Sequence, residues 1–171
     1  MIEFRKDDGG RSAAGFRGTA NDCGVRAAAI VTQSDYRSTY DALYALQKAF
    51  RGNSRKKAVK AKSASPRKGV WKEVMDDYMT KAGAAWVPMA GIGGDIVRVA
   101  DVAKRWSRGR IVMRLARHYS AMIDGVNVDT WPQHPNKRVY GAWIMPEDQH
   151  TGFGLRTGTP DEIDRGHFGQ V

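Results

Sequence analysis

The stretch RIVMRLARHYSAMIDGVNVDTW, residues 110–131, decides the fold of the second half of this chain. Its apolar runs are short and are separated by turn-forming residues, which is typical of strands. The dipeptide Asp124-Gly125 is a strong signal for a two-residue β-hairpin turn. A further run of this kind, RVYGAWIM, follows at residues 138–145. These segments predict an antiparallel sheet.

The register of this hairpin brings a histidine and an acid together. With a two-residue turn, Ser120 lies opposite Asp129, and His118 lies opposite Trp131. Side chains alternate along a strand, so His118 and Asp129 share a face as diagonal neighbours, about 7–8 Å apart between backbones. Two side chains can bridge that distance, whereas a three-residue turn would break the parity. We therefore expect Asp129 to orient the imidazole and Trp131 to shield their hydrogen bond from water.

Three helices are expected before the sheet. Asn21 and Asp22 offer caps ahead of CGVRAAAIVTQ, so Cys23 falls in the first turn of a helix. Apolar residues at helical spacing predict a second helix over 36–50 and a third over 70–83.

The order of these elements indicates the fold class. A short strand in WVPM and a short helix before Gly109 connect the helices to the sheet. Helices followed by a run of strands are typical of an α+β domain. A length of 171 residues with 42% apolar residues suits one domain, which we place at 1–146. The segment 147–171 is rich in Gly, Asp, Thr and Arg without periodicity, which predicts an extended tail or arm.

Cys23 is the only cysteine, which excludes an internal disulfide framework and a multi-cysteine zinc site. A thiol in the first turn of a helix faces the positive end of the helix dipole, and a neighbouring protonated histidine favours the thiolate further. Cys23, His118 and Asp129 are therefore the candidate catalytic triad. For each residue alone, a buried cysteine or a hydrogen-bonded histidine is the structural alternative. The four histidines have no metal-binding spacing, so no metal site or cofactor is expected.

The positive charge is concentrated in one segment. Residues 51–72 hold nine basic residues and no acid, and the rest of the chain is nearly neutral. Small and polar residues dominate its first part, so we expect an exposed basic loop over 51–68. Clustered Lys and Arg favour contact with a polyanion such as nucleic acid; a solvated loop is the alternative. No aromatic residue is interleaved before Trp71, so base stacking is not expected. The candidate polyanion-binding residues are Arg55, Lys56, Lys57, Lys60, Lys62, Arg67 and Lys68.

The sequence also bears on location. Its apolar runs are far shorter than the roughly 20 residues of a membrane span, so no membrane insertion is expected. The first residues, MIEFRKDDGGR, lack the apolar core of a secretory signal, which predicts a protein that is not secreted by a signal peptide.

Several ordered segments resemble the papain-fold cysteine-peptidase-like proteins encoded by tailed bacteriophages. These segments are NDCGVRAAAIVT, SASPRKGVWKEVMDDYMTKAGAAWVPM, GRIVMRLARHYSAMIDGVNVDTW and RVYGAWI. The resemblance covers roughly residues 16–145 and implies a papain-like fold in which Cys23, His118 and Asp129 are catalytic. Papain-like enzymes usually carry an oxyanion-binding Gln shortly before the cysteine, which GFRGTANDC lacks. Asn21 or the Cys23 backbone N–H is the candidate replacement.

These features favour two hypotheses about function. The first is a cysteine hydrolase of peptidase, isopeptidase or amidase type, acting on a protein or peptide substrate. The second is a catalytically inactive papain-fold virion component whose basic loop and C-terminal arm contact DNA or neighbouring phage structural proteins. A weaker third is an anti-defence protein. The expected location is the host cytoplasm or the phage virion.

Overall fold

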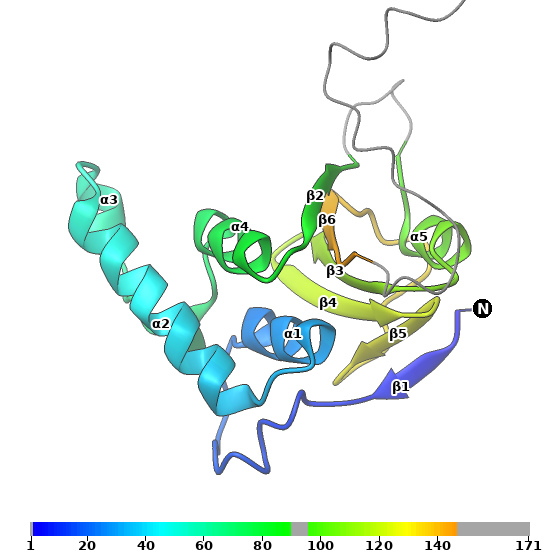
Figure 1. The fold of residues 1–171 in the computed structure, drawn as a ribbon, viewed down its shortest axis with the longest axis horizontal. Helices are drawn as coiled ribbons and strands as arrows, with labels where there is room; N and C mark the ends of the chain where they lie inside the picture. The colour runs from blue at the N-terminus through cyan, green and yellow to red at the C-terminus, as the bar shows by residue number, and fades with distance from the viewer. Residues whose placement is uncertain (1, 90–95, 147–171) are drawn as a thin grey trace, which may run out of the picture.

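The computed structural model describes residues 2–89 and 96–146. The helices cover both faces of a six-stranded sheet with the strand order β1-β5-β4-β3-β6-β2 (Figure 1). The strands are β1 (Phe4–Lys6), β2 (Ala85–Pro88), β3 (Arg110–Leu115), β4 (His118–Ile123), β5 (Val126–Asp129) and β6 (Gly141–Ile144). The helices are α1 (Cys23–Thr32), α2 (Tyr36–Asn53), α3 (Lys57–Lys60), the 3-10 turn η1 (Pro66–Lys68), α4 (Lys72–Lys81) and α5 (Val99–Arg105). The expected α+β class is confirmed.

The predicted hairpin forms with the expected register. Asp124 and Gly125 make the turn between β4 and β5 with φ angles of 50° and 78°, the left-handed values that favour Asp-Gly in this position. Ile123 pairs with Val126, and the pairing continues to Ala121 and Val128. The predicted two-residue turn, on which this register depends, is therefore confirmed.

The sheet departs from the prediction at its edges. β1, which was not expected, pairs in parallel with β5 and makes the sheet mixed rather than wholly antiparallel. Its three residues, Phe-Arg-Lys, carry no alternating pattern, so only the tertiary pairing reveals the strand. At the opposite edge, β2 pairs with β6.

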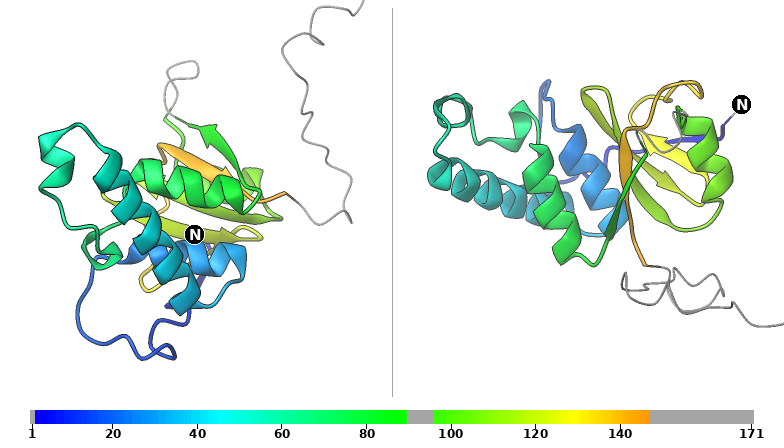
Figure 2. Two further views of the ribbon diagram at one scale, coloured as in Figure 1. Left: turned by 60° about the vertical axis from the view of Figure 1, so that its left-hand side comes forward. Right: turned by 90° about the horizontal axis from the view of Figure 1, so that it is seen from above.

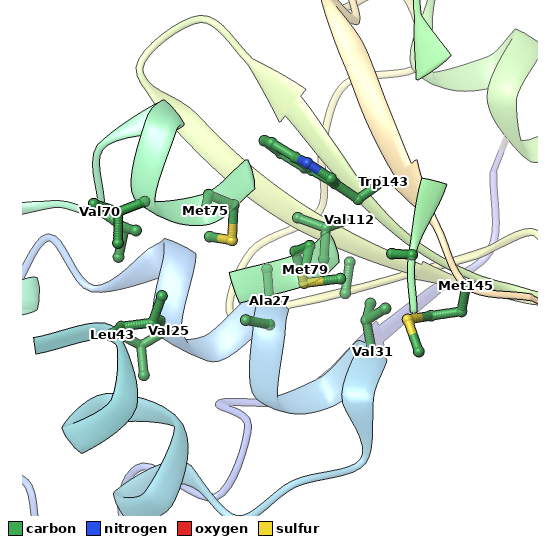
Figure 3. Packing of buried hydrophobic residues seen from close by; sticks show 14 of the residues in the cluster. Val25, Ala27, Val31, Leu43, Val70, Met75, Met79, Val112, Trp143 and Met145 are labelled. Carbon is green, nitrogen blue, oxygen red and sulfur yellow. The ribbon is translucent and has the colours of Figure 1, made fainter. Parts of the chain in front are cut away.

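Helix α1 packs closely against the middle of the sheet because it presents small and β-branched residues. Val25, Ala27, Ala28 and Val31 are buried in a cluster that also holds Met75 and Met79 of α4 and sheet residues such as Val112 and Trp143 (Figure 3). A side chain at Gly24 would not fit, since a Cβ there would lie 2.9 Å from Val70 Cβ and Cγ2. A second cluster, which includes residues of α5, covers the other face of the sheet (Figure 2). The core thus fixes the start of α1 against β4.

The basic segment is more structured than the predicted loop. Helix α2 runs to Asn53, three residues beyond the expected end, and α3 and η1 follow it (Figure 1). The end of the segment then packs against α2, where the side chain of Gln47 is buried. Gln47 Nε2 donates to Ala64 O at 2.8 Å. Gln47 Oε1 in turn accepts from Trp71 N at 2.8 Å. A buried amide therefore anchors the end of the segment, and most of its exposed residues lie in the first part.

Two expectations refer to parts of the chain that the structure does not describe in full. The proposed tail, 147–171, lies outside the described residues. Among the helices of the part that is described, none is long and apolar enough to cross a membrane.

Candidate active site

Cys23 is the first residue of α1, as the sequence predicted, and its side chain is partly buried. The first N–H groups of a helix have no partner within the helix and carry its positive dipole end. The His118 side chain and the backbone N–H of Tyr119 both lie close enough to the sulfur to lower the pKa of the thiol. The thiol therefore lies where α1 meets the beginning of β4.

His118 is the first residue of β4 and joins the thiol to Asp129. Its Nε2 lies 2.7 Å from Asp129 Oδ2, so the expected bridge between the two side chains is present. The imidazole also lies beside the Cys23 thiol. Asp129 is only 6% exposed and His118 18% exposed, so bulk water screens this hydrogen bond weakly.

The carboxylate of Asp129 is held by further donors that the sequence analysis did not assign. Ser120 Oγ donates to Oδ2 at 2.7 Å, and Gln133 Nε2 donates to the same oxygen at 3.2 Å. The backbone N–H of Thr130 donates to Oδ1 at 2.7 Å. These donors favour the ionised form and restrict the direction in which the carboxylate can face His118.

A second tier of polar residues holds those donors in place. Asn127 Nδ2 donates to Ser120 Oγ at 2.8 Å, and Asn127 Oδ1 accepts from Gln133 N at 2.9 Å. Asn127 and Ser120 are 1% and 0% exposed, so the network lies in the interior. The hairpin register could have placed Ser120 and Asn127 on the face of Asp129. Gln133 lies beyond the end of β5, where strand alternation predicts nothing.

The electrostatics favour a thiolate–imidazolium pair. Burial alone would raise the pKa of the Cys23 thiol, but the hydrogen bond and charge of His118 outweigh burial, and the pKa is lowered. Burial would likewise lower the pKa of His118, yet its hydrogen bonds to Asp129 and Cys23 raise that pKa to about 9. Burial opposes ionisation of Asp129 as well, but hydrogen bonds from His118 and Ser120 lower its pKa. Near neutral pH, these shifts keep His118 protonated and Asp129 ionised, and the lowered pKa of Cys23 moves its thiol towards the thiolate form.

The residue before the cysteine anchors the start of α1. Asp22 is 1% exposed, and its Oδ2 accepts from Arg11 Nε and from the Tyr36 hydroxyl, both at 2.6 Å. Its Oδ1 lies 3.1 Å from Arg26 Nε. Sequence reasoning treated Asp22 only as a helix cap, but its side chain makes no capping hydrogen bond. It instead ties the segment before α1 to α2.

Two candidate residues differ from their expected positions. β5 ends at Asp129, so Trp131 does not take the cross-strand place opposite His118, and its side chain is 69% exposed. The predicted shielding by Trp131 is therefore wrong in its geometry; the side chain that covers the carboxylate is Gln133, 8% exposed. Asn21 has an exposed side chain, while its backbone N–H donates to Arg67 O at 2.9 Å. The N–H groups at the start of α1 are the better-placed donors for an oxyanion.

The candidate polyanion-binding residues separate into two groups. Arg67 is only partly exposed, and its guanidinium donates to Arg17 O at 2.9 Å, so its role in the fold is structural. The exposed cations are Arg55, Lys56, Lys57, Lys60, Lys62 and Lys68.

Two surface hollows formed by described residues lie away from the triad. One of about 790 Å³ is lined by residues of α2 and α4, among them Leu46 and Tyr78, and one of about 300 Å³ lies beside Arg5 and Gly9. Neither is lined by Cys23, His118 or Asp129. Within residues 2–89 and 96–146, no group of three or more His, Cys, Asp or Glu side chains is arranged to hold a metal ion.

Comparison with family models, with curated proteins and with solved structures gives no match for this chain. The chemistry of the site is therefore inferred from its geometry. A thiolate at a helix start, a histidine beside it and a buried carboxylate behind the histidine can together carry out acyl transfer.

Proposed function

We propose that this chain is a cysteine hydrolase of papain-like fold from a tailed bacteriophage, with Cys23 as nucleophile, His118 as acid and base and Asp129 as the residue that orients His118. The observation that carries the proposal is the 2.7 Å hydrogen bond between His118 and Asp129 in a histidine that also faces the helix-start thiol. The papain-like character is supported by a helix that begins with the nucleophile and packs on a sheet carrying the other two residues.

The proposed reaction uses each residue at a defined atom. The Cys23 thiolate attacks the carbonyl carbon of an amide, thioester or isopeptide, and the carbonyl electrons move to oxygen, which the first N–H groups of α1 stabilise. His118 gives its proton to the leaving group as that bond breaks, which leaves an acyl thioester. Neutral His118 then takes a proton from water as the water attacks the thioester, and release of the thiolate restores the starting pair. The substrate class is a protein or peptide.

An activated ester tests this proposal without knowledge of the substrate. With p-nitrophenyl acetate, wild-type protein should release p-nitrophenolate over many turnovers, and intact mass spectrometry should find a single acetyl group on Cys23. His118→Ala should slow acetylation by about 10²–10⁴-fold, the range typical of general acid–base catalysis. His134→Ala, at an exposed histidine, is the matched control and should behave as wild type.

Two results would contradict the hydrolase. One is acetylation on lysines with no dependence on Cys23. The other is an alkylation midpoint for Cys23 at or above the ordinary thiol value of about 8.5 in an iodoacetamide pH series, unchanged by His118→Ala. Either would leave Cys23 as a structural thiol.

A papain-fold virion component is the second candidate. The observations in its favour are that neither of the two hollows described above is lined by Cys23 and that GFRGTANDC carries no Gln before the cysteine. In this case the exposed cations of the basic segment and the segment 147–171 would contact DNA or neighbouring phage proteins. Copurification with phage particles, together with an unreactive Cys23, is the expected result. The proposed location is the virion for this role and the host cytoplasm for the hydrolase.

A further inference from the structure

One flank of α2 carries aromatic and basic side chains in a single row. The buried face of this helix is formed by Tyr36, Thr39, Leu43 and Gln47. Residues three and four apart on a helix lie next to each other, so a second row runs along the adjacent flank. We call this row the aromatic–basic strip. It comprises Arg37, Tyr40, Tyr44, Lys48 and Arg51.

The two tyrosines of the strip continue a stack of rings that begins at buried Tyr36 and ends on an exposed ring. The rings of Tyr36 and Tyr40 have centroids 6.3 Å apart and planes 24° apart, and those of Tyr40 and Tyr44 are 6.4 Å and 20° apart. Tyr40 is fixed by Phe16, 4.9 Å away, and by a 3.2 Å contact of its hydroxyl with Ser65 Oγ. Tyr44 continues the row outward and is 41% exposed. A fixed stack therefore presents one open ring to solvent.

From Tyr44 to the end of α2, every charged residue is basic. Lys48 and Arg51 are exposed and follow Tyr44 on the same flank. No acidic residue occurs from residue 42 to residue 72, and Asp41 is the only acid within α2. Figure 1 shows the second half of α2 and α3 extending away from the sheet, so the cations of α3 and the residues around it adjoin the strip.

We infer that the aromatic–basic strip is a binding site for single-stranded nucleic acid. Proteins that bind single strands combine a positively charged track for the phosphates with aromatic rings on which bases stack. From Arg37 to Arg51 the strip extends over about 21 Å at the helical rise, which offers phosphate contacts on both sides of the Tyr44 ring. An exposed ring can stack only on an unpaired base, so the strip should prefer single strands to duplex. The inference differs from the expectation that stacking plays no part, because α2 places aromatic residues that precede the basic segment next to its cations.

The site is distinct from the proposed hydrolase. The strip shares no residue with Cys23, His118 or Asp129, and α2 lies on the far side of α1 from β4 (Figure 2). Nucleic-acid binding should therefore be the same in Cys23→Ala and in wild type. Either proposal can fail while the other stands.

The test is fluorescence anisotropy with a labelled oligothymidine and with a duplex of equal length, measured over a range of salt concentrations. Wild type should bind the oligothymidine more tightly than the duplex. Tyr44→Ala should weaken oligothymidine binding by about 5- to 150-fold, the effect of one lost base stack, and should leave duplex binding nearly unchanged. Tyr44→Phe keeps the ring and should bind as wild type. Lys48→Gln with Arg51→Gln should reduce the salt slope by up to about 1.4, since each phosphate contact to a single strand contributes about 0.7.

The controls separate stacking from general positive charge. Lys104→Gln removes an exposed cation of α5, on the opposite side of the sheet, and should leave both affinities unchanged. Thermal unfolding of each variant checks that the exposed substitutions keep the fold. Equal binding of duplex and single strand with no effect of Tyr44→Ala would overturn the inference in favour of phosphate contact alone. Undetectable binding of oligothymidine at low salt would also overturn it.

Discussion

Arg26 donates a 2.8 Å hydrogen bond to Thr130 Oγ1, across 104 positions of sequence. Thr130 directly follows Asp129 and donates its backbone N–H to that carboxylate at 2.7 Å. Arg26 also lies 3.1 Å from Asp22, the residue before Cys23. One guanidinium therefore connects the beginning of the nucleophile's helix with the strand end that carries the acid.

Replacing Arg26 should lower the free energy of unfolding and raise the pKa of the Cys23 thiol. Arg26→Gln removes the contacts to Asp22 and Thr130, while Arg11 and Tyr36 still hold Asp22, so we expect a loss of about 1–3 kcal/mol in the free energy of unfolding. The charge of Arg26 also contributes, after burial and His118, to the pKa of Cys23, so the alkylation midpoint should rise. Arg26→Lys keeps the charge and should leave that midpoint closer to wild type than Arg26→Gln does. Urea unfolding and an iodoacetamide pH series measure the two effects; equal midpoints in all three proteins would contradict the electrostatic part.

Asp129→Asn should change how stability depends on pH. The pKa of His118 is raised from 6.5 to about 9, so its stabilising contribution is complete below about 6.5 and is lost as pH rises through about 9. The pKa of Asp129 is lowered from 3.8, so its contribution is complete above that value and is lost as pH falls through the lowered pKa. The free energy of unfolding should therefore differ most between wild type and Asp129→Asn, by about 1–3 kcal/mol, at pH values between the lowered pKa of Asp129 and the raised pKa of His118.

Urea unfolding at several pH values measures this difference. It should shrink both in strong acid and above pH about 9. Asp77→Asn, at an exposed acid of α4, is the control and should show a small, nearly pH-independent effect. A difference for Asp129→Asn that stays constant with pH would contradict the ionised His118–Asp129 pair.

Gly24→Ala should destabilise the protein through a specific contact. The added Cβ would lie 2.9 Å from Val70 Cβ and Cγ2, so α1 or the segment with Val70 must shift, at a cost of about 1–3 kcal/mol. Val70→Ala in the same chain removes Cγ2 but keeps Val70 Cβ, so it relieves part of the clash, and the double variant should be more stable than the sum of the single effects predicts. Simple additivity in urea unfolding would show that the contact is not the cause.

Limited digestion with trypsin should distinguish the two halves of the basic segment. Cleavage is expected first after the exposed residues Arg55, Lys56, Lys57, Lys60 and Lys62. Arg67 should resist, because its guanidinium and carbonyl are both hydrogen-bonded and the preceding Pro66 is buried. Peptide mapping by mass spectrometry identifies the sites. Early cleavage after Arg67 would show that the return to the protein body is looser than the buried contacts of Gln47 indicate.

Local rules were sufficient for the central hairpin and for the position of the thiol. Asp124-Gly125 adopts left-handed angles at little cost, which fixes the turn, and strand alternation then places His118 and Asp129 on one face. The run of good helix formers from Cys23 likewise indicates the start of α1, although the side-chain cap expected of Asp22 does not form. These features depend on neighbours in the sequence, so the sequence by itself determined them.

Contacts between distant segments were decided only by the tertiary structure. The parallel strand β1 and the bridge of Arg26 to Thr130 join segments that are far apart in the sequence and whose own surroundings carry no periodic signal. The hydrogen bond of Gln133 to Asp129 is local, but it forms beyond the end of β5, where strand alternation gives no guide. The same cause explains the error at Trp131, since β5 ends before Trp131 can face His118. A short polar side chain or a three-residue strand gains stability only from the partner that folding brings to it, and sequence periodicity does not record that partner.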